Sequence, residues 1–207
     1  MNSKVRDLLV TNILAVLLGL SVSGLLLLFL GENPLTAMGV LFGSLFRDSY
    51  TFADVFVKAT PLMFTALAFA LTFQANLFNI GAQGQFYIGA VTAVWLSLLL
   101  QDKLPGPLVL VIVGVATILT GGLWGGSIGW LKAKFNANEF LVSMMSTYVA
   151  LNIMNYLLRT WLLEGKGEYP QTDPLEKVVW LPTILPGTRL HGGFVLALLS
   201  CIGIWVL

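Results

Sequence analysis

The chain has 207 residues, of which 57% are hydrophobic and only 10% are charged, and its net charge is +1. A soluble domain carries about 25% charged residues, so this composition excludes a water-soluble globular protein and predicts an integral membrane protein. The sequence has no basic cluster for nucleic acid, and one cysteine (Cys201) and one histidine (His191) cannot supply a disulfide framework or a Cys/His metal site from this chain.

The first expected span covers residues 8–30, an uncharged apolar run. A membrane core is crossed by about 20 such residues. Lys4 and Arg6 precede the run, as basic residues do in a secretory signal peptide. The run is longer than a typical signal and no clean cleavage site follows it. We therefore expect an uncleaved anchor helix.

No charged residue occurs in residues 59–101, a run about twice as long as one crossing requires. Two spans are expected here, with their turn within residues 74–85. This part includes the stretch "LFNIGAQGQFYIGA", in which glycines and amides interrupt the apolar run. Irregular backbone at membrane depth is tolerated only inside protein or along a watery cavity. Two interpretations stay open: an ordinary cytoplasmic turn, or a broken or re-entrant helix near Asn79–Gln85 beside a solute pathway.

Two further spans are expected at residues 107–131 and 140–158. Residues 159–193 are polar and rich in proline, so we expect an extracytoplasmic loop, followed by a short apolar run from Phe194 to the last residue. The expected fold is an all-α polytopic bundle of about five full spans plus a truncated sixth. We expect residues 1–207 to form one transmembrane domain, the amino-terminal part of a longer chain.

Orientation follows from the basic residues of the short connections, which favour the cytoplasmic side. With Lys4 and Arg6 inside, the succession of spans places Lys132 and Lys134 inside as well. The loop of residues 159–193 then lies outside. We therefore expect a cytoplasmic amino terminus.

Glycines recur every four residues in the fourth expected span, at Gly121, Gly125 and Gly129. Such a stripe lets another helix approach closely, and packing within the subunit, a subunit interface or a moving helix would each use it. Gly125, Ser127 and Gly129 also match the G-x-S-x-G pattern of hydrolases, but within an apolar helix rather than a strand–turn–helix. No P-loop occurs in the sequence, so we expect neither a catalytic site nor ATP binding by this chain.

Two groups of uncharged polar residues are candidates for a solute pathway. Amides can hydrogen-bond an uncharged polar solute, whereas a coupling ion or proton usually requires intramembrane charges. Asn138 is expected to cap the fifth span, with Glu139 in its first turn. The pathway candidates are Asn76, Asn79, Gln83, Gln85, Ser143 and Thr147.

Two blocks of the sequence resemble the permease subunits of bacterial ABC-type importers, in the branched-chain amino acid/ribose/nucleoside permease family. The first is "ATPLMFTALAFALTFQANLFNIGAQGQFYIGA", in which N-I-G-A-x-G-Q matches the pattern of nucleoside and simple-sugar permeases. The second is "NEFLVSMMSTYVA". Gln83 stands where the family usually has glutamate, and Thr147 stands where it has asparagine. These departures leave the family assignment intact and bear on the substrate.

The resemblance implies a permease of a bacterial cytoplasmic membrane, importing a nucleoside or, second, a simple sugar by alternating access. The implied partners are a second permease subunit (identical or different), cytoplasmic ABC ATPases and an extracytoplasmic solute-binding protein. ATP and magnesium would be bound by the ATPases and no cofactor by this chain. Lys132, Lys134 and Glu139 are candidates for a minor ATPase contact.

Two other functions remain as alternatives. A secondary transporter would run on an ion gradient, but the expected spans lack the carboxylates or lysines that usually bind coupling ions. A membrane assembly subunit without transport of its own would suit the glycine stripe, but would leave the amide-rich turn without a purpose.

Overall fold

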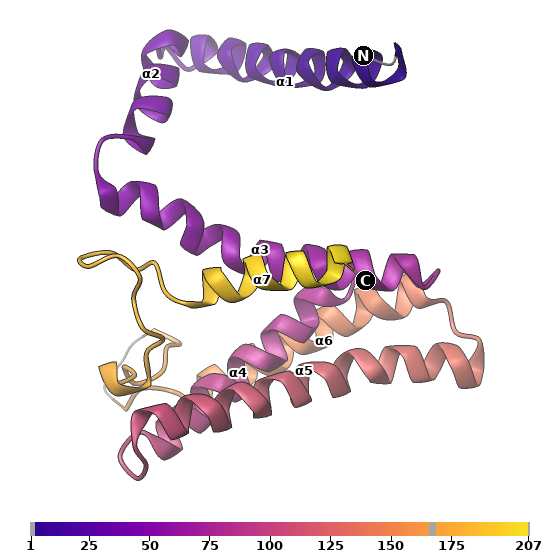
Figure 1. Ribbon diagram of the computed structural model, residues 1–207, viewed down its shortest axis with the longest axis vertical. Helices are drawn as coiled ribbons and strands as arrows, with labels where there is room; N and C mark the ends of the chain where they lie inside the picture. Colours follow the sequence, from indigo (N-terminus) through magenta and orange to yellow (C-terminus); the bar gives the residue numbers. More distant parts are fainter. Residues whose placement is uncertain (1–2, 166–168, 207) are drawn as a thin grey trace. The chain divides into compact units, whose positions relative to one another are not determined.

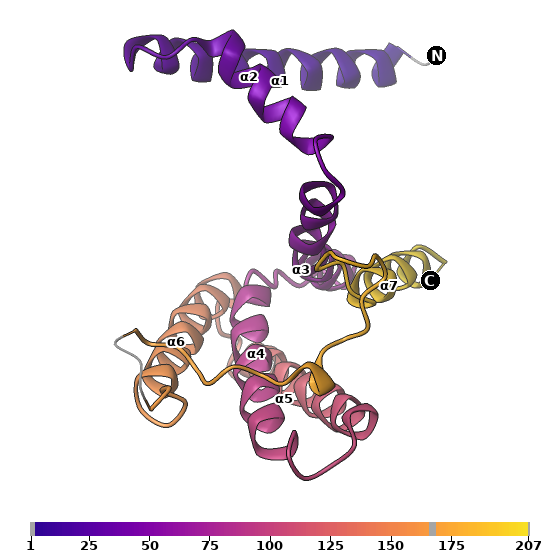
Figure 2. The same cartoon turned by 90° about the vertical axis from the view of Figure 1, so that its left-hand side faces the viewer.

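The computed structural model describes residues 3–165 and 169–206, with side chains from Val10 onward (Figures 1 and 2). Within these ranges the chain is helical, and its only β-type pairing is an isolated antiparallel bridge between Thr183 and His191. The side chains of Lys4 and Arg6, on which the predicted orientation partly rests, lie outside the described residues, as do residues 166–168 of the predicted loop.

The chain divides into two compact units, Met1–Val55 and Phe56–Leu207, which are described separately. The first holds α1 (Ser3–Phe29) and the short α2 (Pro34–Leu45). The side-chain oxygen of Asn33 caps α2 by accepting hydrogen bonds from the backbone N–H groups of Leu35 and Thr36. From the sequence no element is assigned to these residues, because twelve residues are too few to cross a membrane, although the Asn-Pro start is a typical helix signal.

The five predicted full spans are confirmed as long apolar helices. Besides α1 they are α3 (Ser49–Gln74), α4 (Ala82–Leu100), α5 (Gly106–Phe135) and α6 (Glu139–Arg159). The predicted short sixth segment is α7 (Gly193–Val206). The all-α polytopic fold is therefore confirmed.

The amide-rich stretch holds the turn between α3 and α4, and from Ala82 onward it forms the first part of α4. Asn76 adopts a left-handed backbone conformation, with φ of 56°, which ends α3. The Leu77 N–H then donates back to the Thr72 carbonyl at 2.9 Å, as in common helix C-terminal motifs. Before α4 begins, the Asn79 side-chain oxygen accepts a hydrogen bond from the Gly81 N–H at 3.1 Å.

Helix α4 lies against both α5 and α6, and its own glycines permit the contact (Figure 2). A Cβ atom at Gly84 would lie 3.0 Å from the Thr147 Cα atom of α6. A Cβ atom at Gly89 would lie 3.1 Å from a Thr117 methyl group of α5. Small residues are the usual means of close helix packing in lipid, where the hydrophobic effect does not drive association.

The glycine stripe of α5 contacts α4 at two of its three positions. A Cβ atom at Gly121 would lie 3.5 Å from the Gln85 carbonyl oxygen, and one at Gly125 would overlap the Gln85 amide. A Cβ atom at Gly129 would meet no described atom within 4 Å. The packing role of Gly129 therefore stays a prediction.

The predicted start of α6 is confirmed. The Asn138 side-chain oxygen accepts hydrogen bonds from the N–H groups of Phe140 at 3.1 Å and Leu141 at 3.2 Å. Glu139 occupies the first turn, where the helix dipole favours a negative charge. Lys132 and Lys134 lie in the last turn of α5, where a positive charge is favoured.

The polar segment between α6 and α7 folds back over the connection between α4 and α5. The Gln101 side-chain oxygen accepts a hydrogen bond from the Glu176 N–H at 3.1 Å. A short 3-10 helix, η1 (Lys177–Val179), follows and lies so close to Gly106 that a Cβ atom there would overlap the Val178 carbonyl. The part of this segment around Glu176 and Val178 thus contacts the end of α4 and the start of α5.

Replacing Gly84 by alanine tests the contact between α4 and α6. Because the obstructing atoms belong to the Thr147 backbone, the helices must shift, and we expect a loss of about 1–3 kcal/mol in stability. The melting temperature of the purified full-length permease in detergent measures this effect. Gly114→Ala on α5 is the control, since nothing described lies within 4 Å of its added methyl group. Equal melting temperatures for the two variants would contradict the close contact.

Candidate functional site

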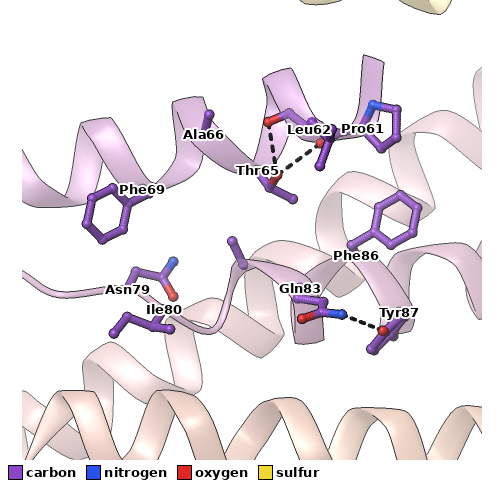
Figure 3. A pocket seen from close by; sticks show the side chains of 11 residues that line it. Pro61, Leu62, Thr65, Ala66, Phe69, Asn79, Ile80, Gln83, Phe86 and Tyr87 are labelled. Carbon is purple, nitrogen blue, oxygen red and sulfur yellow. Dashed lines mark hydrogen bonds between the residues drawn. The ribbon is translucent and has the colours of Figure 1, made fainter. Parts of the chain in front are cut away.

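A hollow of about 670 Å³ lies between α3 and the start of α4 (Figure 3). Helix α3 contributes one wall, and the turn with the first part of α4 contributes the other. The lining residues are Pro61, Leu62, Thr65, Ala66 and Phe69 on the first wall and Asn79, Ile80, Ala82, Gln83, Phe86 and Tyr87 on the second. We refer to this space as the solute hollow.

The polar groups of the solute hollow are amides and hydroxyls. Gln83 donates a hydrogen bond from its side-chain nitrogen to the Tyr87 hydroxyl at 2.6 Å (Figure 3). This bond fixes the orientation of the amide and leaves the Gln83 oxygen without a partner among the described residues. The Asn79 oxygen is engaged by Gly81, whereas its amide nitrogen has no described partner. The Gln83 oxygen therefore remains as an acceptor for a ligand, and the Asn79 amide nitrogen and the Tyr87 hydroxyl hydrogen remain as donors.

None of the lining residues carries a charge, and three are aromatic. Phe69, Phe86 and Tyr87 come from both walls, and Figure 3 shows Phe69 and Phe86 at opposite ends of the hollow. Aromatic faces bind flat or apolar surfaces of a ligand, and a few amides fix its orientation. This lining suits an uncharged solute that is polar at its edge and apolar on its faces.

Pro61 places a weak point in α3 at the wall of the hollow. Proline has no N–H to donate to the carbonyl four residues earlier, so the helix lacks one internal hydrogen bond there. One turn later the Thr65 hydroxyl donates to the carbonyls of Pro61 at 3.1 Å and Leu62 at 3.0 Å, not to the Val57 carbonyl that the proline leaves without its helical donor. Irregular helices of this kind are tolerated in membranes where backbone groups find other partners.

A small cavity of about 70 Å³ lies behind the turn, bounded by residues of α3, α5 and α6. The Ser143 hydroxyl of α6, which is fully buried, donates to the Phe78 carbonyl at 3.4 Å. Lys132 and Glu139 line the same cavity. The turn therefore lies level with the charged ends of α5 and α6, not at the middle of the helices.

The charged residues at this level form one pair. The Lys132 ammonium nitrogen lies 3.8 Å from a Glu139 carboxylate oxygen, and that oxygen is buried without a hydrogen bond. Lys134 lies instead over the Trp130 ring, 5.1 Å from its centroid. No group of three or more His, Cys, Asp or Glu residues in the described ranges is arranged to hold a metal ion.

The structure brings together only part of the predicted pathway. Asn79 and Gln83 line the solute hollow, and Asn79 and Ser143 line the small cavity behind it. Gln85 contacts Gly125, and Thr147 contacts Gly84, so both side chains lie at helix contacts. Asn76 is exposed at the end of α3. The pathway role of these residues stays a prediction.

Sequence reasoning missed the aromatic part of the hollow. Phenylalanine is frequent throughout the spans, so composition does not distinguish a ligand-facing ring from a lipid-facing one. The spacing carried a signal: Phe86 and Tyr87 follow Gln83 by three and four residues and share its helix face. Phe69 and Ile80 had no such signal, because they face the hollow only through the packing of α3 beside the turn.

The chain is similar to several ABC transporter permeases along nearly its whole length. The chain is 32% identical over 206 residues to the glucose ABC transporter permease protein TsgB13 of Haloferax volcanii, covering 95% of this chain and 54% of that protein. It is 30% identical over 200 residues to the guanosine ABC transporter permease protein NupP of Bacillus subtilis, covering 95% and 57%. It is 24% identical over 210 residues to the nucleoside ABC transporter permease protein NupB of Lactococcus lactis, covering 98% and 57%.

The chain thus spans about half the length of these relatives. They are permease subunits, which are transport components rather than enzymes. No solved structure matches the chain. The family model described as branched-chain amino acid transport system / permease component matches residues 51–207, which include the solute hollow and the helices that form it. This match covers most of the sequence, and the chain belongs to that permease family.

Proposed function

We propose that the chain is part of the transmembrane permease subunit of an ATP-driven importer, and that it forms one side of the path for a small uncharged solute. The observation that carries this proposal is the solute hollow, in which amides and aromatic rings line a space without any charged side chain. Relatives that are named as glucose, guanosine and nucleoside permeases support the same solute class.

Within that class we favour a nucleoside, with a simple sugar second. A nucleobase offers a flat apolar face for stacking and a polar edge that pairs with amides. Phe86 and Gln83 lie three residues apart on one face of α4 and supply one group of each kind. A sugar also stacks on aromatic rings, but it requires many hydrogen bonds, and the hollow offers few free polar groups.

The driving energy would come from partners. We propose two cytoplasmic ABC ATPases that bind ATP and magnesium, a second permease subunit, identical or different, and an extracytoplasmic solute-binding protein. The amino terminus and the Lys132–Glu139 pair would then lie on the cytoplasmic side of the cell membrane. On that side Lys132, Lys134 and Glu139 would be available for a minor contact with an ATPase.

The alternatives are less well supported. A secondary transporter binds its coupling ion through charged groups inside the membrane, and the lining of the solute hollow has none. A pure assembly subunit needs no free donor and acceptor beside aromatic rings. Neither alternative agrees with relatives that are named as ABC permeases.

Uptake by the complete transporter tests the proposed function. The full-length permease, its ATPases and its binding protein are reconstituted in proteoliposomes with labelled guanosine, uridine, glucose or ribose. We expect nucleoside uptake that requires ATP. If only sugars are taken up, the ATP-driven importer stands and the solute is a sugar rather than a nucleoside. Uptake that does not require ATP, or no uptake of any of these solutes, would overturn the proposal.

Separate substitutions of Gln83 and Gln85 distinguish a role in solute binding from a role in helix packing. In Gln83→Leu the solute loses one hydrogen bond, so uptake at low solute concentration should fall about 3- to 10-fold while the melting temperature stays near wild type. Gln85→Leu removes the amide that contacts Gly125 and should chiefly lower the melting temperature. The reverse pattern would show that Gln85, not Gln83, faces the solute.

A substitution of Phe86 tests whether the nucleoside stacks on this ring. Stacking of a base on an aromatic ring is worth about 1–3 kcal/mol, so Phe86→Ala should raise the half-saturating nucleoside concentration about tenfold or more. Phe64→Ala on α3 is the matched control, because Phe64 is similarly exposed and lies outside the hollow. An equal effect of both substitutions on nucleoside uptake would contradict stacking at Phe86.

A further inference from the structure

A second hollow, of about 690 Å³, lies at the end of the helices where α5 joins α6. Its walls come from the end of α3, the turn before α4 and the connection between α5 and α6, including Lys132, Asn138 and Glu139. We refer to it as the inner hollow. Unlike the solute hollow, it is lined by both members of the charged pair and by a helix cap, which are groups that belong beside water.

The two hollows share two lining residues, Phe69 of α3 and Ile80 of the turn. Figure 3 draws both side chains at the same end of the solute hollow, one from each wall. The polar lining of the solute hollow, at Gln83 and Tyr87, lies on one side of this pair, and Lys132 and Glu139 lie on the other. Phe69 and Ile80 are thus the two side chains that lie where one hollow adjoins the other.

The position of the pair along the membrane fits such a passage. Phe69 precedes the end of α3 at Gln74 by five residues, which is about 7–8 Å along the helix. Pro61, the farthest lining residue on α3, precedes Phe69 by eight residues, or about 12 Å. The solute hollow therefore extends into the membrane from Phe69, and the inner hollow continues from Phe69 to the aqueous end.

We propose that Phe69 and Ile80 form the inner gate of the solute pathway, an inference that rests on the proposed permease function. Phe69 and Ile80 are 39% and 40% exposed in this structure, so the gate would close when the two walls approach each other. Apolar side chains that meet across a passage exclude water, and apolar constrictions close pores by this dewetting. An uncharged polar solute cannot cross while its hydrogen-bonding groups would meet only hydrocarbon.

Ile80 lies in the turn that is linked directly to α6. The Ser143 hydroxyl donates to the Phe78 carbonyl at 3.4 Å, and a Cβ atom at the buried Gly81 would lie 3.3 Å from the Ser143 carbonyl oxygen. From Gly84 onward, α4 is fixed by close backbone contacts. Because Ser143 lies one turn beyond Glu139 on α6, a shift of the α5–α6 connection reaches the gate through that hydrogen bond. A cytoplasmic partner acting on this connection would thereby control the gate.

Opening the gate by mutation should produce a leak. In the complete reconstituted transporter, preloaded with labelled solute and without ATP, we expect Phe69→Ala and Ile80→Ala to speed efflux about tenfold, which corresponds to about 1.4 kcal/mol off the barrier. The milder Phe69→Leu and Ile80→Val should leak less, in order of the volume removed. These milder variants keep the test valid if the alanine variants fail to assemble.

The controls remove similar side chains that line neither hollow. Phe64→Ala lies on the same helix as Phe69, with 42% against 39% of its surface exposed. Leu77→Ala lies in the same turn as Ile80, with 38% against 40% exposed, and it lines the small cavity behind the turn rather than either hollow. Leaks of equal size in controls and gate variants, or no leak in any gate variant, would overturn the gate.

A variant that fills the gate gives the opposite readout. Ile80→Trp should lower ATP-dependent uptake severalfold while the complex still hydrolyses ATP, because the passage is blocked and the motor is untouched. Unchanged uptake would contradict the gate. The wild-type complex separates the two proposals: if it imports no solute with ATP, the proposed function fails, whereas normal import with no leak in the variants rejects only the gate.

Discussion

The close approach of α4 to α5 and α6 is the constraint on which the rest of the site depends. In lipid, helices gain little from the hydrophobic effect and associate mainly by van der Waals contact, which requires small residues where the backbones meet. Gly84 and Gly89 provide that contact on α4. With one face of α4 fixed in this way, Gln83, Phe86 and Tyr87 must face the opposite wall, α3. The packing glycines thus set the direction of the solute-binding face.

Most of the fold could be predicted from the sequence because hydropathy alone dictates helix formation in a membrane. The five spans, the turn after Gln74 and the cap at Asn138 all follow from apolar length, interruption and capping chemistry. Helix α2 could not be found by span length, since it is too short to cross. Its cap at Asn33 was the signal that a search for spans ignores.

The candidate site was less predictable, because an amide in a membrane segment has two uses. Gln85 looks as polar as Gln83 in sequence, yet it contacts Gly125 while Gln83 faces the hollow. The difference is one of helix face, since residues two positions apart point in nearly opposite directions. Which face meets α5 depends on the glycines of both helices, and that pairing is fixed only by the folded structure.

The amide-rich turn serves the backbone first and the solute second. A connection at this level has N–H and carbonyl groups outside any helix, and each must find a partner. The Asn79 oxygen accepts a hydrogen bond from the Gly81 N–H, and the Ser143 hydroxyl donates one to the Phe78 carbonyl. Because Ile80 lies between Phe78 and Gly81 in the turn, the same hydrogen bonds that hold the turn also position Ile80. What remains free, the Asn79 nitrogen and the Gln83 oxygen, lines the solute hollow. This turn joins α3 to α4, which is packed against α5 and α6, so a shift of the α6 backbone at Ser143 is passed directly to the residues that line the solute hollow.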